Sequence, residues 1–227
     1  MHDQIENIYS LTPLQKGLLY HEAYAPESRV YYQQMSIGLA GELDLDAFRQ
    51  AWLALMQRHA VLRTAFLWEE LDDAYQVILK EVDLPLREVD LRGNPQGLTA
   101  LAAEDHAQAF ELGAAPLMRL ILARLDDVNG LAQWSLVWTH HHLLLDGWSV
   151  GSLLADWRDL YRAARRGQSR SGERSLRHPA SADARCRAGA LPCDRQADRV
   201  GLIRVCGWCW RSLPGGCARS HLTKGVH

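Results

Sequence analysis

The residue types best suited to chemistry lie together in one short stretch, residues 139–149, with the sequence THHHLLLDGWS. Histidines occupy positions 140–142 at the end of an apolar segment, and Asp146 and Gly147 follow within reach. Imidazole is the side chain best matched to moving protons near neutral pH. A nearby carboxylate can orient the ring or the loop, and a glycine lets a substrate approach the backbone closely. The stretch therefore predicts a site of acid–base chemistry at the end of a strand.

The same stretch allows interpretations without acid–base chemistry. A histidine at the end of a strand is often an ordinary structural residue. His140 and His142 would share one face of the strand, and together with Asp146 they could bind zinc. Ser149 is a nucleophile by residue type, but a short polar residue before an apolar helical pattern is better explained as a helix N-cap. This stretch alone leaves the alternatives open.

Two further segments, taken together with this one, resemble a known family. Residues 11–19 (LTPLQKGLL), 58–66 (RHAVLRTAF) and 141–147 (HHLLLDG) are similar to three blocks of the condensation domains of nonribosomal peptide synthetases: S/T-P-x-Q, RHxxLRTxF and HHxxxDG. These domains belong to the chloramphenicol-acetyltransferase-like acyltransferase superfamily. The blocks occur in the family's order, and the resemblance covers roughly residues 5–166. It implies that this part of the chain is the N-terminal lobe of a two-lobed condensation domain.

The resemblance implies a role for each matching residue. His142 matches the catalytic histidine, which stands where the amine of an acceptor aminoacyl thioester attacks a donor thioester. That histidine acts as general base, or it positions the amine and stabilises the tetrahedral intermediate. His141 matches a supporting histidine, and Gly147 a glycine whose backbone lies beside the reacting centre. Asp146 matches a largely structural aspartate, paired with the arginine that Arg63 matches.

The resemblance also implies the partners. Both substrates would arrive on phosphopantetheine arms of peptidyl or aminoacyl carrier domains, so no directly bound cofactor and no metal ion is expected. Two alternatives remain. An epimerisation domain shares HHxxxDG but normally needs a glutamate from the second lobe, and a noncatalytic fragment would be a remnant or a carrier-docking lobe. The heterocyclising subtype is disfavoured because its signature replaces the histidines with aspartates.

Hydrophobic periodicity predicts the elements that position these residues. The expected helices cover residues 12–24, 44–59, 98–109 and 149–161. The expected strands cover residues 31–39, 62–68, 74–79, 117–125 and 131–139. Helices and strands are interleaved without a strict βαβ rhythm, which favours an α/β fold with a mixed sheet and flanking helices.

Composition divides the chain into two parts. Residues 1–168 carry 14 Lys and Arg against 23 Asp and Glu, whereas residues 169–227 carry 11 against 4. All five cysteines lie in the second part, where only 9 of 59 residues are Leu, Ile, Val, Phe or Met. So little apolar surface predicts disorder. We therefore expect an ordered domain over residues 1–168 and a basic, disordered tail over residues 169–227.

The tail also lacks the family's later blocks, which build the second lobe. Its richness in Arg, Gly, Ala, Ser, Cys and Pro is typical of a GC-rich coding sequence read out of frame, so we expect a non-native tail on a truncated domain. The alternative is a small zinc module formed by Cys206, Cys209, Cys217 and His221. With half of the substrate tunnel missing, the chain is expected to be inactive alone.

The overall composition excludes several classes of protein. A formal net charge of −2 differs from the basic balance of a nucleic-acid-binding domain. The first residues, MHDQIENIYS, do not form a secretory signal, and no uncharged run approaches the roughly 18 residues of a membrane span. A cytoplasmic location, without nucleic-acid or membrane partners, is the expectation.

Overall fold

The computed structural model describes residues 4–167 and residues 203–204. The expected disorder and frameshift origin of the tail, and the alternative zinc module within it, lie outside the described residues. The elements, in chain order, are β1 (Ile5–Ser10), α1 (Pro13–Tyr24), η2 (Pro26–Ser28), β2 (Tyr32–Ala40), α2 (Leu45–Arg58), η3 (Ala60–Arg63), β3 (Thr64–Leu67), β4 (Tyr75–Leu79), β5 (Leu86–Asp90), α3 (Gly97–Ala107), β6 (Met118–Val128), β7 (Leu131–His141), α4 (Gly147–Arg165) and β8 (Ile203–Arg204).

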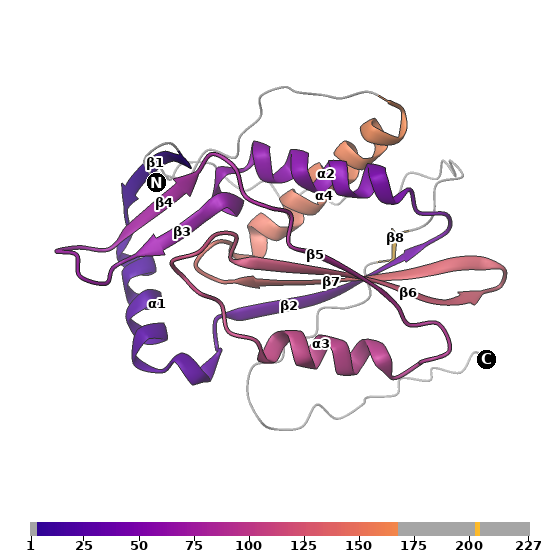
Figure 1. The fold of residues 1–227 in the computed structure, drawn as a ribbon, viewed down its shortest axis with the longest axis horizontal. Helices are drawn as coiled ribbons and strands as arrows, with labels where there is room; N and C mark the ends of the chain where they lie inside the picture. Colours follow the sequence, from indigo (N-terminus) through magenta and orange to yellow (C-terminus); the bar gives the residue numbers. More distant parts are fainter. Residues whose placement is uncertain (1–3, 168–202, 205–227) are drawn as a thin grey trace, which may run out of the picture.

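The larger sheet carries the histidine stretch and has the strand order β5-β6-β7-β2-β8. β5 runs parallel to β6, whereas β6–β7, β2–β7 and β2–β8 are antiparallel pairs. Helices α2 and α4 cover one face of this sheet, and α3 covers the other (Figure 1). The predicted α/β fold with a mixed sheet and flanking helices is therefore confirmed. Within the described residues, no helix is long and apolar enough to cross a membrane.

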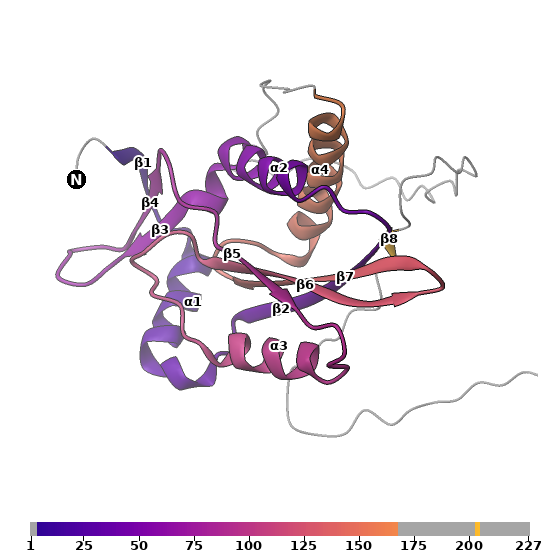
Figure 2. The ribbon, with the colours of Figure 1, turned by 45° about the vertical axis from the view of Figure 1, so that its right-hand side comes forward.

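The smaller sheet has the order β1-β4-β3 and lies beside α1 at one end of the larger sheet (Figure 2). Sequence periodicity did not predict β1 or β5. β1 contains no buried residue and β5 is at most half-buried, so neither shows the apolar alternation that identifies a strand. The 3-10 helix η3 also takes up Leu62 and Arg63, with which the strand predicted over residues 62–68 would have begun.

The helices begin where polar caps satisfy the first backbone N–H groups. Thr12 accepts a hydrogen bond from the backbone N–H of Gln15, whose side chain accepts one in return from the N–H of Thr12. Asp44 accepts from the backbone N–H of Ala47 at 2.9 Å and so caps α2. The predicted beginnings of these two helices are confirmed.

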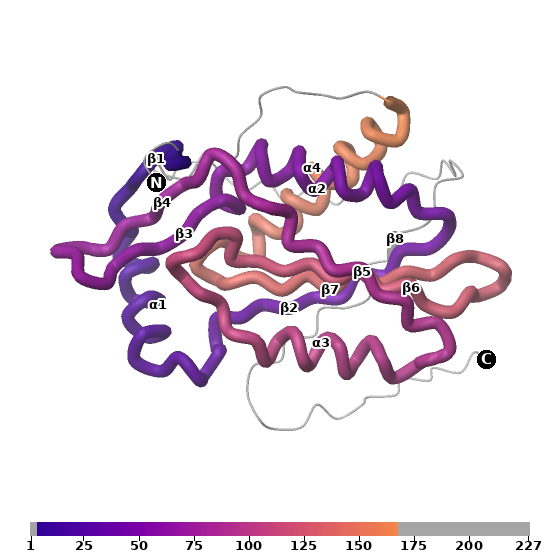
Figure 3. The backbone as a smooth tube through the Cα atoms, viewed as in Figure 1, coloured from indigo at the N-terminus to yellow at the C-terminus, as the bar shows by residue number. Residues whose placement is uncertain are grey.

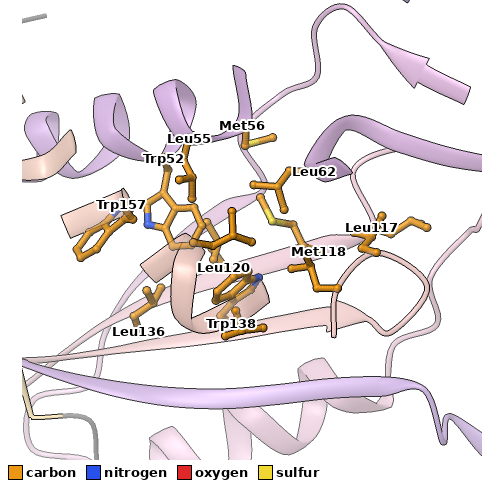
Figure 4. Close-up of a cluster of buried hydrophobic side chains, with 14 of the residues drawn as sticks. Trp52, Leu55, Met56, Leu62, Leu117, Met118, Leu120, Leu136, Trp138 and Trp157 are labelled. Carbon is orange, nitrogen blue, oxygen red and sulfur yellow. The ribbon is translucent and has the colours of Figure 1, made fainter. Parts of the chain in front are cut away.

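The main core lies between the larger sheet and the helix pair α2 and α4. Trp52 of α2 meets Trp138 of β7 edge-on, with ring centroids 5.3 Å apart, and Trp157 of α4 lies 5.9 Å from Trp52 (Figure 4). The opposite face of β7 is also buried, because Val137 packs beneath α3 with Leu101. Burial on both faces makes β7 a rigid central strand, and the histidine stretch begins where it ends.

Candidate active site

The end of β7 is fixed by backbone pairing on both sides. His141 is in register with Tyr32 of β2, while β6 pairs with the other edge of the strand. One residue further, the backbone N–H of His142 donates to the carbonyl of Tyr31 at 2.7 Å. From there the backbone trace leads through a short turn into α4 (Figure 3). The histidines therefore stand on, or directly after, a central strand of the sheet that is paired along both edges.

The His141 ring is completely buried. Its Nδ1 accepts a hydrogen bond from the backbone N–H of Leu143 at 3.1 Å, so the neutral ring carries its proton on Nε2. That Nε2 lies 3.7 Å from a carboxylate oxygen of Glu22. Burial, together with the nearby charge of His142, lowers the pKa of His141 to about 4, which keeps this ring neutral at physiological pH.

The His142 ring is only partly buried, and it has the opposite tautomer. Its Nδ1 lies 2.7 Å from the backbone carbonyl oxygen of Leu145. Because a carbonyl oxygen only accepts, Nδ1 must donate, and the ring proton of the neutral imidazole therefore sits on Nδ1. Nε2 has no hydrogen-bond partner among the residues that the structure describes, so its lone pair can accept a proton. The arrangement suits a general base, since one nitrogen is oriented by the backbone and the other is open to a proton.

His140 is not part of this arrangement. Its ring is buried against Trp138, at a centroid distance of 5.2 Å, and burial lowers its pKa to about 3. Among the described residues, no three His, Cys, Asp or Glu side chains are grouped so as to hold a metal ion. The alternative zinc site formed by His140, His142 and Asp146 is therefore not assembled.

Asp146 is exposed and caps α4. Its carboxylate accepts from the backbone N–H of Ser149 at 2.7 Å, and the hydrogen bonding from Ser149 lowers its pKa. The prediction that Ser149 caps this helix was wrong, because the helix begins at Gly147 with Asp146 as its N-cap, which places Ser149 inside the first turn. Gly147 is exposed in the first turn of the helix, next to the turn that carries His142.

Arg63 does not pair with Asp146, contrary to the expectation from the resemblance. Its guanidinium donates to the carbonyl oxygens of Met56, at 3.0 Å, and of Lys80, and to the carboxylate of Glu6 at 2.7 Å. Arg63 ends η3, the short 3-10 helix that comes after α2 and His59, so it lies near the last turn of α2, whose carbonyl groups lack helical partners and require donors. It therefore ties the end of α2 to β1 and to the residues that follow β4.

Sequence reasoning did not identify Glu22 or the Leu145 carbonyl as parts of the site. Glu22 lies three residues after Leu19 on the buried side of α1, and this position in the apolar stripe was its only signal. The Leu145 carbonyl gives no signal in the sequence, because backbone groups are present at every position.

Comparison with known proteins identifies the family. The Condensation domain family matches residues 5–175. One component of the linear gramicidin synthase of Brevibacillus parabrevis is 40% identical over 162 residues, which are 69% of this chain and 2% of that protein. Bacitracin synthase 1 of Bacillus licheniformis is 34% identical over 172 residues, 74% of this chain and 3% of that protein. This chain belongs to the condensation domain family.

These relatives are nonribosomal peptide synthetases. Solved condensation domains share the fold of this chain. The starter condensation domain of rhizomide synthetase RzmA superposes with a TM-score of 0.65 at 21% identity, over 75% of this chain and 42% of that one. The first condensation domain of the CDA synthetase gives 0.64 at 20%, over 72% and 41%. The resemblance to an N-terminal condensation-domain lobe is confirmed, and the epimerisation and noncatalytic alternatives are not favoured. The chain spans about two fifths of these solved domains.

Proposed function

We propose that this chain supplies the histidine-bearing lobe of a condensation domain that forms a peptide bond between a donor acyl thioester and an acceptor aminoacyl amine. The observation that carries the proposal is the tautomer of the His142 ring, together with its partial exposure. Its Nδ1–H is held by the Leu145 carbonyl, while Nε2, on a partly exposed ring, is an acceptor without a partner in the described part of the chain. A base fixed in this way needs no reorganisation before it takes a proton.

His142 acts on the attacking amine. As the amine nitrogen bonds to the thioester carbonyl carbon, its proton passes to Nε2 of His142. Collapse of the tetrahedral intermediate breaks the C–S bond, and the departing thiolate takes the proton back. The imidazolium formed in between is stabilised by its hydrogen bond to the Leu145 carbonyl and by the negative charge of Asp146, which interacts with the charge on His142.

The neighbouring residues have distinct roles in this proposal. His141 fixes the turn from inside the protein. Gly147, exposed in the first turn of α4, leaves room for the substrate to approach the backbone. Asp146 caps the start of α4 and also supplies the negative charge near His142. Arg63 supports the fold from the end of α2.

Carrier domains deliver the two substrates in this proposal. Each thioester is held on a phosphopantetheine arm, so the reaction needs no cofactor bound by this chain, and it takes place in the cytoplasm. The solved condensation domains are longer than this chain, which spans about two fifths of them. Orientation of two tethered substrates contributes much of the rate of such a reaction. The proposed activity therefore belongs to the complete domain, with this lobe contributing the base.

A chimeric domain tests the proposal. Residues 5–166 replace the matching segment of a condensation domain of the linear gramicidin synthase, and dipeptide formation is measured with loaded donor and acceptor carrier domains. The chimera is expected to form dipeptide, and His142→Ala to lower the rate by about 10²–10⁴-fold, the usual contribution of a general base. His106→Ala, a matched control on α3 at the opposite face of the sheet, should leave the rate nearly unchanged. A folded chimera whose rate does not depend on His142 would contradict the proposal.

A further inference from the structure

A buried carboxylate lies behind the histidine pair. Glu22, on α1, is only 6% exposed. Its Oε2 lies 3.7 Å from Nε2 of His141, and neither atom has a hydrogen-bond partner among the described residues. Buried polar atoms in folded proteins are nearly always hydrogen-bonded. Two unpartnered atoms that face each other across this short gap therefore require an explanation.

The tautomer of the His141 ring places an N–H donor opposite the Glu22 carboxylate. The backbone N–H of Leu143 occupies Nδ1, so the ring proton is on Nε2, the nitrogen that faces Glu22. A proton donor thus faces a carboxylate oxygen inside the protein. A small shift of either side chain completes a charge-assisted hydrogen bond, and leaving both groups unpaired in the interior would be unfavourable.

The Tyr32 hydroxyl belongs to the surroundings of the same carboxylate. It accepts a hydrogen bond from the backbone N–H of Phe110 at 2.9 Å. Burial raises the pKa of Glu22, while the Tyr32 side chain and the charges of His21 and Arg29 lower it. These opposing influences come from α1, β2 and the segment around Arg29, so the carboxylate lies where several elements meet.

We propose that Glu22 is a positioning residue for His142. Its carboxylate holds the His141 ring with the proton on Nε2, and Nδ1 of that ring then anchors the backbone N–H of Leu143 in the turn that carries His142. The same turn brings the Leu145 carbonyl to Nδ1 of His142. Glu22 never touches the substrate, and its importance for catalysis rests on the function proposed for His142.

Removal of the carboxylate would act through the turn. Without an acceptor at Nε2, only the hydrogen bond from the Leu143 N–H still favours a proton there, and the Nε2–H is left unpaired in the interior. If the proton moves to Nδ1, the Leu143 N–H loses its acceptor and faces another donor. The turn must then rearrange, and the contact between Nδ1 of His142 and the Leu145 carbonyl is lost with it.

The test uses the full 227-residue chain with nitrogen-15-labelled histidines, because ring nitrogen shifts report directly which nitrogen carries the proton. Glu22→Met removes the carboxylate at similar volume, whereas Glu22→Gln keeps an oxygen that can accept from Nε2. Glu104→Met, the same change at an exposed position on α3, is the control. The spectra do not depend on catalysis, so failure of this inference is distinguishable from failure of the chimera to make dipeptide.

In the unsubstituted chain, and with Glu22→Gln or Glu104→Met, His141 is expected in a single form protonated on Nε2. With Glu22→Met we expect loss of that single form, together with displaced signals of the His142 ring. Unchanged ring-nitrogen shifts of both histidines in Glu22→Met would overturn the inference. Should this variant not fold, the unsubstituted spectrum decides, since a proton on Nδ1 of His141 would overturn the inference and one on Nε2 would support it.

Discussion

The two sides of the strand end that carries the histidine pair differ in almost every respect. On the inner side, His141 is completely buried, has a lowered pKa and directs its Nε2–H toward a carboxylate. On the outer side, His142 is partly exposed and directs its Nδ1–H toward a backbone carbonyl, and no group in residues 4–167 bonds its Nε2. Identical side chains at adjacent positions thus take opposite tautomers. The difference shows that the surroundings of an imidazole, rather than the imidazole itself, separate a structural histidine from a reactive one.

The largest expected effect on the inner side is a dependence of stability on pH. The pKa values of His140 and His141 are lowered to about 3 and about 4, chiefly by burial. An unfolded chain, with histidine pKa values of about 6.5, takes up protons below pH 6.5 that the folded chain does not. The contribution of these two histidines to the free energy of unfolding is therefore fully present above this pH and is lost as the pH is lowered.

Between pH 7 and pH 5, we expect a loss of about 2 kcal/mol in the free energy of unfolding for each of these two histidines. The raised pKa of Glu22 has the opposite sign and offsets part of this loss. Urea unfolding of the full chain at the two pH values measures the difference. Equal stability at both would show that the inner rings are not buried as neutral groups.

The next effect separates the two neighbours by stability. His141→Ala leaves a cavity and removes the acceptor of the Leu143 N–H, so the free energy of unfolding at pH 7 should fall by about 3 kcal/mol. His142→Ala removes a partly exposed ring with one hydrogen bond, and a loss of about 1 kcal/mol is expected. Urea unfolding compares the variants. A larger loss for His142→Ala would reverse the comparison.

A smaller effect belongs to the cap on the outer side. Asp146→Ala removes the acceptor for the backbone N–H of Ser149 at the start of α4. The expected loss is about 1 kcal/mol, the usual value for an N-cap carboxylate. Asp146→Asn keeps a capping oxygen and should recover most of it. Thermal unfolding of the two variants is the measurement, and equal destabilisation by both would argue against capping.

The smallest expected effect is the coupling between Arg63 and Asp146. Arg63 hydrogen-bonds Met56 and Glu6, whereas Asp146 bonds Ser149, and the two side chains share no partner among the residues that the structure describes. The losses caused by Arg63→Ala and Asp146→Ala should therefore add to within about 0.5 kcal/mol in the double variant, measured by urea unfolding. A larger coupling energy would show that Arg63 and Asp146 interact, as the sequence resemblance implied.

The sequence located the fold and the reactive stretch because both depend on local patterns. Apolar periodicity and polar caps predicted the four helices, and the spacing of His141, His142, Asp146 and Gly147 marked the family. β1 and β5 escaped prediction because their residues are half-buried or exposed, and strands of this kind carry no alternating signal.

The rest of the site depends on contacts between distant segments, which no local pattern encodes. The partners of Arg63 come from α2, from β1 and from the segment after β4, so only the folded chain reveals them. Glu22 fitted the apolar stripe of its helix, but its role in the site was not predicted, because a glutamate is rarely buried and the general expectation for one on a helix is an exposed position. The tautomers of His141 and His142 follow from single hydrogen bonds to the backbone of one turn.

The central claim is that His142 presents a free Nε2 because the Leu145 carbonyl holds its Nδ1–H. The nitrogen-15 spectrum of the neutral His142 ring in the full chain tests it most directly. We predict a protonated Nδ1 and an unprotonated Nε2 for His142, opposite to His141. A proton on Nε2 of His142 would contradict the account, since the nitrogen assigned to the incoming amine would already be occupied.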